Sequence, residues 1–134
     1  MKSPHWIDPL ALVLLHGETL AEHGGLSGLR DAAALESSLA RPRHRYTYEP
    51  GADLAQLAAS YGFGIVRNHP FVDGNKRVGF LAIGLFLSLN GFELTARPVD
   101  SVQTIFRLAA GELSEPQLAE WIRKHMTRHR RKAL

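Results

Sequence analysis

Apolar residues recur at every third or fourth position along most of this chain, with polar residues between them. This spacing places apolar side chains on one face of an α-helix. Capping or breaking residues bound these segments: Asp53 precedes one, Gly24 and Pro70 each follow one, and Arg30 with Asp31 suits an ion pair and cap at a helix start. The pattern predicts helices at residues 9–23, 31–40, 53–68, 75–89, 99–110 and 115–128.

The segment at residues 75–89 differs from the other predicted helices because nearly every residue in it is apolar or small. A helix of this kind is buried on most of its surface, and Asn90 and Gly91 then end it. Its uninterrupted run, residues 78–87, is too short to cross a bilayer. We therefore expect a buried central helix, and we expect no membrane partner.

Residues 41–51 interrupt the helical pattern. Pro42 disfavours continuation of a helix, Pro50 follows, and Tyr46 and Tyr48 alternate with other residues, which is typical of a loop or a short β-flap. A second short extended piece is predicted at residues 92–95. The fold class that follows is all-α: a compact helical bundle around the buried central helix, with at most a short β-flap.

Composition narrows the class of protein further. A chain of 134 residues with 45% hydrophobic and 22% charged residues suits one folded domain and argues against disorder. Cysteine is absent, which excludes disulfides and thiolate chemistry and is compatible with a reducing compartment. The first eight residues include Pro4, His5 and Asp8, where a signal peptide would need its apolar core. We expect a cytoplasmic protein.

Charge is distributed unevenly along the chain. Residues 1–120 carry ten Lys and Arg against thirteen Asp and Glu, whereas residues 121–134 carry six Lys and Arg and no acid, so the net charge of +3 belongs to the tail. A basic chain end is usually solvated, and we expect residues 124–134 to be a frayed tail. Contact with nucleic acid or an acidic partner is the alternative, although the acidic body argues against direct nucleic-acid binding.

The candidate chemistry lies between the two most apolar helices. Pro70 disfavours helical geometry at His69 and ends the first of them, which leaves His69 in a turn where its imidazole can accept a proton near pH 7. Asp73 is a hard oxygen ligand suited to phosphate-bound Mg²⁺, or alternatively an N-cap for the second helix. Arg67, two residues before His69, is a further candidate for the same pocket.

The second helix begins with an anion turn, residues 74–77. The first amides of the helix, those of Gly74, Asn75 and Lys76, have no intrahelical acceptor and lie at the positive end of its dipole. Gly74 allows the backbone to approach a ligand closely. Lys76 and Arg77 add positive charge, and the fork of Arg77 matches phosphate oxygens. Together with His69 and Asp73, this turn predicts a phosphoryl- or nucleotidyl-transfer site.

The nine residues 69–77, His-Pro-Phe-Val-Asp-Gly-Asn-Lys-Arg, resemble the motif of the Fic/Doc family, His-x-Phe-x-Asp/Glu-Gly/Ala-Asn-Gly/Lys-Arg. The similarity to the short Doc-type (death-on-curing) toxins of this family covers residues 5–123. The resemblance implies a single Fic/Doc domain over residues 1–134. It also implies that His69 is the general base for a target Ser or Thr hydroxyl, that Asp73 binds Mg²⁺, and that the anion turn holds phosphate and stabilises its charge, chiefly through Arg77.

Two departures indicate the branch of the family. Most Fic enzymes have Gly where this chain has Lys76, and a second Arg where it has Phe80; those enzymes transfer AMP. Lys76 would crowd the turn, and Phe80 removes a phosphate-binding fork. Doc proteins share both changes, which implies that ATP binds in the opposite orientation and that its γ-phosphate is transferred. A protein Ser/Thr kinase is therefore expected, with an adenylyltransferase and a non-catalytic, antitoxin-binding co-repressor as alternatives.

The resemblance also implies partners. Many Fic proteins block their own site with a Ser/Thr-x-x-x-Glu-Gly/Asn helix, which is absent here because Leu118 stands four residues after Ser114. Restraint would come instead from an antitoxin whose C-terminal helix binds a groove lined by apolar residues of the early helices. The implied target is a translation GTPase, elongation factor Tu, whose segment would pair with the β-flap over the active site.

Overall fold

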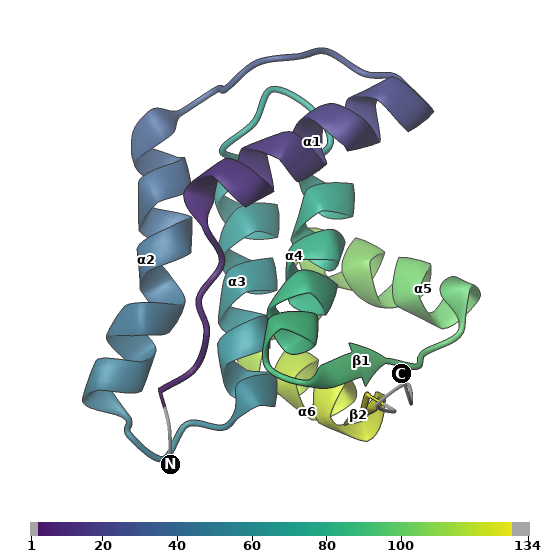
Figure 1. Ribbon diagram of the computed structural model, residues 1–134. Helices are drawn as coiled ribbons and strands as arrows, with labels where there is room; N and C mark the ends of the chain where they lie inside the picture. The colour runs from purple at the N-terminus through teal and green to yellow at the C-terminus, as the bar shows by residue number, and fades with distance from the viewer. Residues whose placement is uncertain (1–2, 130–134) are drawn as a thin grey trace, which may run out of the picture.

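Six helices and one small antiparallel sheet make up residues 3–129, the part of the chain that the computed structural model describes (Figure 1). Helices α2, α3 and α4 lie side by side, and α1 crosses the upper ends of α3 and α4. Helix α5 lies beside α4, and α6 packs against α3 near its lower end. The predicted all-α bundle with little β-structure is confirmed. The elements are α1 Pro9–His23, α2 Ala32–Tyr48, α3 Leu54–Asn68, α4 Asn75–Leu89, β1 Phe92–Leu94, α5 Pro98–Ala109, α6 Glu115–Lys124 and β2 Met126–Arg128.

Helices α2 and α3 start at the caps that their sequences predict. The Asp31 carboxylate accepts the Ala34 amide at the start of α2, and the Asp53 carboxylate accepts the Gln56 amide at the start of α3. Each bond satisfies an amide that has no intrahelical acceptor. These local contacts explain why the starts of α2 and α3 were predictable to within one residue.

Helices α3 and α4 form the centre of the bundle. Most side chains of α3 are buried, and α4, the predicted central helix, buries Val78, Ala82, Ile83, Phe86 and Leu87. Burial of α4 is nevertheless incomplete, since Leu81 and Leu89 are exposed. The core therefore depends on both helices together.

Two glycines set the distance between α3 and α4. A Cβ on Gly79 of α4 would lie 2.5 Å from Cγ2 of Val66, and a Cβ on Gly62 of α3 would lie 2.6 Å from Cδ1 of Ile83. Both distances are shorter than non-bonded carbon atoms tolerate. The two helices can pack this closely only because both positions lack a side chain.

Helix α2 contradicts the prediction of a loop or β-flap at residues 41–51. It continues through Pro42 as far as Tyr48, although proline removes one intrahelical hydrogen bond. Contacts of α2 with two other helices offset this loss. Ser38 of α2 is buried, and its hydroxyl accepts a hydrogen bond from Nδ2 of Asn68 in α3. Helix α2 also binds α6 through ion pairs. Packing against neighbouring helices therefore outweighs the local helix-breaking effect of Pro42.

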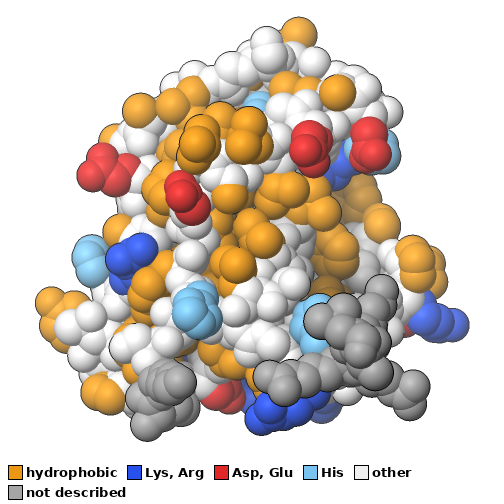
Figure 2. All heavy atoms as spheres, in the orientation of Figure 1, with side chains coloured by type: hydrophobic (Ala, Val, Ile, Leu, Met, Phe, Trp, Pro, Cys, Tyr) orange, Lys and Arg blue, Asp and Glu red, His pale blue; other side chains and the backbone are white. Residues whose placement is uncertain are grey.

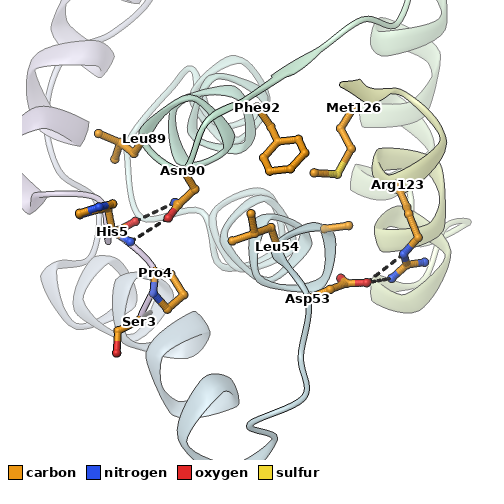
Figure 3. A pocket seen from close by; sticks show the side chains of 11 residues that line it. Ser3, Pro4, His5, Asp53, Leu54, Leu89, Asn90, Phe92, Arg123 and Met126 are labelled. Carbon is orange, nitrogen blue, oxygen red and sulfur yellow. Dashed lines mark hydrogen bonds and ion pairs between the residues drawn. The ribbon is translucent and has the colours of Figure 1, made fainter. Parts of the chain in front are cut away.

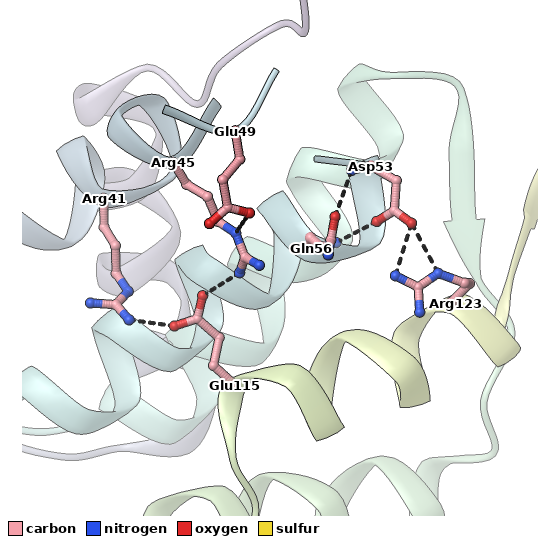
Figure 4. Close-up of polar contacts among 7 residues, drawn as sticks. All are labelled: Arg41, Arg45, Glu49, Asp53, Gln56, Glu115 and Arg123. Atoms are coloured by element: carbon pink, nitrogen blue, oxygen red, sulfur yellow. Dashed lines mark hydrogen bonds and ion pairs between the residues drawn. The ribbon is translucent and has the colours of Figure 1, made fainter. Parts of the chain in front are cut away.

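Ion pairs attach α6 to the rest of the bundle (Figure 4). The Glu115 carboxylate at the start of α6 binds both Arg41 and Arg45 of α2, the latter at 2.7 Å. At the other end of α6, Arg123 binds the Asp53 carboxylate at 2.8 Å. The two pairs of Glu115 help to hold α2 in a helix beyond Pro42.

The end of the chain differs from the predicted helix at residues 115–128. Helix α6 ends at Lys124, and β2 pairs antiparallel with β1, so that Phe92 faces Arg128 and Leu94 faces Met126. The prediction of an extended segment after Gly91 is confirmed, and that segment supplies the partner strand. The basic tail thus begins in paired structure, and its last part, residues 130–134, lies outside the described residues. None of the described helices is both long and apolar enough to cross a membrane.

The glycine contact gives a stability prediction. Gly79→Ala should lower the free energy of unfolding by about 1–3 kcal/mol, the usual cost of overpacking a core, because Val66 is fully buried and cannot move aside. Gly84→Ala in the same helix is the matched control, since nothing lies within 4 Å of its Cβ position; it should be neutral or stabilising by up to about 1 kcal/mol. Urea denaturation of both variants tests this, and equal midpoints would disprove the close contact.

Candidate active site

The motif forms the loop between α3 and α4, as predicted. His69 caps the C-terminus of α3 with φ 49° and ψ 59°, and it is the only residue other than glycine with positive φ among residues 3–129. Such left-handed geometry is unfavourable for a side chain with a Cβ and is concentrated at functional sites. Its side chain is exposed and lines a cleft of about 440 Å³ together with Arg30, Arg67, Asn68, Phe71, Val72 and Asn75.

Arg30 reaches the motif, contrary to the prediction that it pairs with Asp31. Its Nε donates to the carbonyl of His69 at 2.5 Å, and its Nη2 donates to the carbonyl of Asn68 at 2.7 Å. Carbonyls at the end of a helix lack intrahelical donors, so this fork satisfies two of them and holds the left-handed turn. The local pattern around Arg30 carried no signal of this contact.

An extended segment at residues 28–31 lies beside the motif. The amides of Arg30 and Asp31 donate to the Pro70 carbonyl, and the amide of Val72 donates to the Gly28 carbonyl. Leu29 and Phe71 form the resulting antiparallel bridge. The β-like segment next to the candidate site is therefore residues 28–31, and the flap predicted at residues 41–51 is wrong. In the sequence, the glycines within residues 24–28 were the one local indication that the chain is non-helical here.

Asp73 carries a negative charge in the loop. Its Oδ2 accepts the amide of Leu26 at 3.2 Å, and its Oδ1 accepts the amide of Gly74 at 2.9 Å. These two bonds, with smaller contributions from Arg77 and Lys76, hold the pKa of Asp73 below its ordinary value of 3.8. The side chain is exposed and ionised at neutral pH.

Of the two roles predicted for Asp73, the structure does not show capping of α4. Gly74 is the N-cap of α4, and no side chain caps the helix. The donor set instead fits Mg²⁺, which usually takes one or two protein carboxylates and completes its shell with phosphate oxygens and water. Among the described residues no cluster of three acidic, His or Cys side chains offers a different metal site.

The N-terminus of α4 has the properties expected of an anion turn, with one correction. The amide of Gly74 was predicted to face an anion, but it donates to Asp73. The amides of Asn75 and Lys76 stay at the positive end of an uncapped helix. Arg77 is exposed, and its guanidinium has no hydrogen bond or ion pair within residues 3–129, so it is free to bind an anion.

The other predicted phosphate ligands have different surroundings. The side chain of Asn75 is buried and bound to Phe71: its Oδ1 accepts the Phe71 amide at 3.0 Å, and its Nδ2 donates to the Phe71 carbonyl at 2.9 Å. The side chain therefore closes the loop, and only the backbone amide is available to phosphate. Lys76 turns toward α5, where Nζ lies 5.5 Å from the centre of the Phe106 ring.

Arg67 and His16 complete the surroundings of the loop. Arg67 lines the cleft beside His69, with Nη1 3.5 Å from the Leu108 carbonyl of α5. His16 of α1 packs beneath the loop and was not predicted, because a single histidine in an amphipathic helix carries no local signal of its partner. The structure thus brings Arg67, His69 and Asn75 to one cleft. Asp73 and the rest of the anion turn adjoin it in the same loop and helix start, where Arg30 and His16 bind the backbone.

A larger cavity of about 600 Å³ lies elsewhere, between the starts of α3 and β1 and the end of α6 (Figure 3). Leu54, Phe92 and Met126 make its lining largely apolar, and none of the motif residues reaches it. Volume alone would favour this cavity. Chemistry favours the smaller cleft, since it holds the strained histidine and adjoins the ionised Asp73 and the uncapped helix.

Comparison with known proteins agrees with this geometry. The family model described as Fic/DOC family matches residues 6–87. "Protein kinase doc" of Escherichia phage P1 is 33% identical over 118 residues, which cover 88% of this chain and 93% of that protein. "Toxin Doc" of Mycolicibacterium smegmatis is 38% identical over 74 residues, 54% of this chain and 57% of that protein. The chain belongs to the Fic/Doc family and is similar to its Doc toxins, as the motif predicts.

Arg77 provides a binding test of the anion turn. Arg77→Ala should weaken the binding of ATP in the presence of Mg²⁺ by about 10- to 100-fold, the equivalent of one or two charge-assisted hydrogen bonds. Arg43→Ala removes the same charge from α2, outside the cleft, and should leave the affinity unchanged. Isothermal titration calorimetry compares the two variants, and equal affinities would exclude Arg77 from the phosphate site.

Proposed function

We propose that this protein is a toxin-type protein kinase that transfers the γ-phosphoryl group of ATP to a Ser or Thr hydroxyl of a target protein. The observation that carries the proposal is the convergence of three features on one short loop: the strained, exposed His69, the ionised Asp73 and the uncapped start of α4. The name of the phage P1 relative, "Protein kinase doc", supports it.

The chemistry assigns one task to each feature. His69 accepts the proton of the target hydroxyl as its oxygen bonds to the γ-phosphorus. The bond between that phosphorus and the oxygen bridging to the β-phosphate breaks, and ADP leaves with the electron pair. Arg77 and the first amides of α4 stabilise charge on the transferring group. Asp73 would hold Mg²⁺, which neutralises charge on the phosphates.

The choice of kinase over adenylyltransferase rests on Lys76 and Phe80. Phe80 is half-buried against the core and provides no guanidinium one turn after Arg77. Lys76 supports the choice less strongly, since its ammonium group contacts Phe106 and does not fill the turn. Because the Lys76 side chain leaves the anion turn open, adenylyl transfer remains the second candidate function. The complete His, Asp, Asn and Arg set argues against the third alternative, a co-repressor without catalysis.

Residues 28–31 are suited to hold the target segment. The backbone hydrogen bonds that flank the Leu29–Phe71 bridge are made by Gly28 and Arg30. The amide and carbonyl of Leu29 therefore point away from residues 70–72 and are left without a partner in that segment. A target strand can pair with this edge and bring its hydroxyl to the cleft that holds His69. A translation GTPase, elongation factor Tu by resemblance, is the proposed target, and the protein would act in the cytoplasm.

The outer face of α1 is suited to the antitoxin. Leu10, Val13 and Leu14 are exposed at the spacing of one helical face. An apolar groove of about 370 Å³ between the start of α1 and α2 continues this surface, lined in part by Leu35 and Leu39. Figure 2 shows hydrophobic side chains gathered on the side of the molecule that α1 crosses. A C-terminal antitoxin helix with an apolar face would cover them.

The transferred group can be identified directly. With ATP labelled at the γ-phosphate, protein in a bacterial lysate should become labelled, whereas label at the α-phosphate should not be transferred. His69→Ala is the matched control: it should reduce transfer by about 10²–10⁴-fold, as expected for loss of a general base, while the melting temperature stays near that of the wild type. Transfer from the α position alone would refute the kinase and support the adenylyltransferase.

Lys76→Gly tests the contribution of the anion turn to this choice. The substitution removes the contact with Phe106 and restores the residue common among Fic enzymes, so γ-phosphoryl transfer should weaken and a small transfer of AMP should appear. Phe80→Arg in the same background should increase AMP transfer further by adding the missing fork. The two labels measure both products. An unchanged γ-transfer rate in Lys76→Gly would show that Lys76 has no part in nucleotide orientation.

A further inference from the structure

Among residues 3–129, His16 of α1 is the only buried histidine and is 5% exposed, although it lies on a helix that contributes no motif residue. Leu12 and Thr19 are buried on the same face of α1. The other six histidines, including His69, are exposed or half-buried. A polar ring buried in this position needs a partner, and it finds one in the active-site loop.

Two contacts join His16 to that loop, 57 residues further along the chain. Its Nε2 lies 2.8 Å from the Asp73 carbonyl oxygen, and because a carbonyl only accepts, Nε2 carries the hydrogen and donates it. Its ring stacks on that of Phe71, with the centroids 3.8 Å apart and the planes 11° apart. A Cβ added at Gly74 would lie 3.6 Å from Cδ2 of the same imidazole, so His16 also lies next to the N-cap of α4.

The contacts fix the part of the loop that precedes α4. Asn75 binds both backbone groups of Phe71 from inside the loop, and His16 holds the Phe71 ring and the Asp73 carbonyl from outside. The orientation of that carbonyl sets the plane of the peptide between Asp73 and Gly74. The same peptide carries the Gly74 amide that binds the Asp73 carboxylate.

We propose that His16 is a positioning residue: its hydrogen bond to the Asp73 carbonyl and its stack on Phe71 orient the Asp73 carboxylate and the start of the anion turn for phosphoryl transfer. The proposal rests on the function proposed above. His16 makes no contact with the reacting groups, and it acts through the backbone of the loop. A displacement of about 1 Å at a reacting group can cost about 100-fold in rate.

Core packing by His16 is the competing explanation, and two substitutions separate the explanations. His16→Phe keeps a flat ring for the stack and removes the donor, whereas His16→Gln keeps an N–H donor and removes the stack. Leu12→Val is the matched control, since it disturbs the buried face of α1 at a residue that makes no hydrogen bond to the loop. If His16 only packed, His16→Phe would behave like Leu12→Val.

The first measurement is amide hydrogen exchange at Gly74 and Leu26, the two amides that bind the Asp73 carboxylate. In His16→Phe their protection should fall by about tenfold, as expected for loss of one neutral hydrogen bond. Protection should be retained in Leu12→Val and largely retained in His16→Gln. Unchanged protection in His16→Phe would overturn the proposal. If His16→Phe does not fold, a tenfold loss in His16→Gln would overturn the role of the donor.

The second measurement is γ-phosphoryl transfer as a function of Mg²⁺ concentration. His16→Phe should lower kcat by about 10- to 100-fold and raise the Mg²⁺ concentration needed for half-maximal rate, whereas Leu12→Val should change neither. Lost protection with normal transfer would overturn the catalytic part of the proposal. If the wild type transfers no phosphate, the proposed kinase activity fails, and the exchange data alone still decide whether His16 positions the loop.

Discussion

The close approach of α3 and α4 at Gly62 and Gly79 is the constraint on which the rest of the structure depends. Neither position can accommodate a Cβ without displacing Ile83 or Val66, so the two helices pack with their backbones near one another. Helix α3 ends at Asn68, directly before His69, and α4 starts at Asn75, directly after Gly74. The distance from His69 to the anion turn is therefore set by helix packing, and the intervening loop only has to span it.

The polar residues around that loop differ in what their side chains bind. Asn75, Arg30 and His16 use their polar groups on backbone atoms of the loop. The side chains of His69 and Arg77 are exposed, and the exposed Asp73 carboxylate also accepts the amides of Leu26 and Gly74. A loop with a left-handed histidine is costly, and these supporting contacts offset the cost. Support of this kind beneath exposed side chains is what the proposed transfer site requires.

Helix starts and the motif loop were predictable because their causes are local. Asp31 and Asp53 cap the helices that follow them, and Pro70 ends α3 where expected. Pro42 is the instructive failure, since its local effect is real, but burial of Ser38 and the ion pairs of Arg41 and Arg45 with Glu115 hold α2 in a helix. The last strand was missed for a similar reason: residues 126–128 pair with residues 92–94 of β1, which are 32 to 36 positions earlier.

The sequence by itself determined the helical periodicity, the Asp31 and Asp53 caps, and the placement of His69 and Asp73 between two helices with Arg77 at the start of the second. Each of these depends mainly on neighbours within about four residues. Only the tertiary structure decided which residues support that loop. It brought Arg30 to the His69 carbonyl across 39 positions and His16 to the Asp73 carbonyl across 57. It also turned Lys76 toward Phe106 and placed residues 28–31 beside the motif. Such contacts are decided by how helices pack, and no local pattern encodes them.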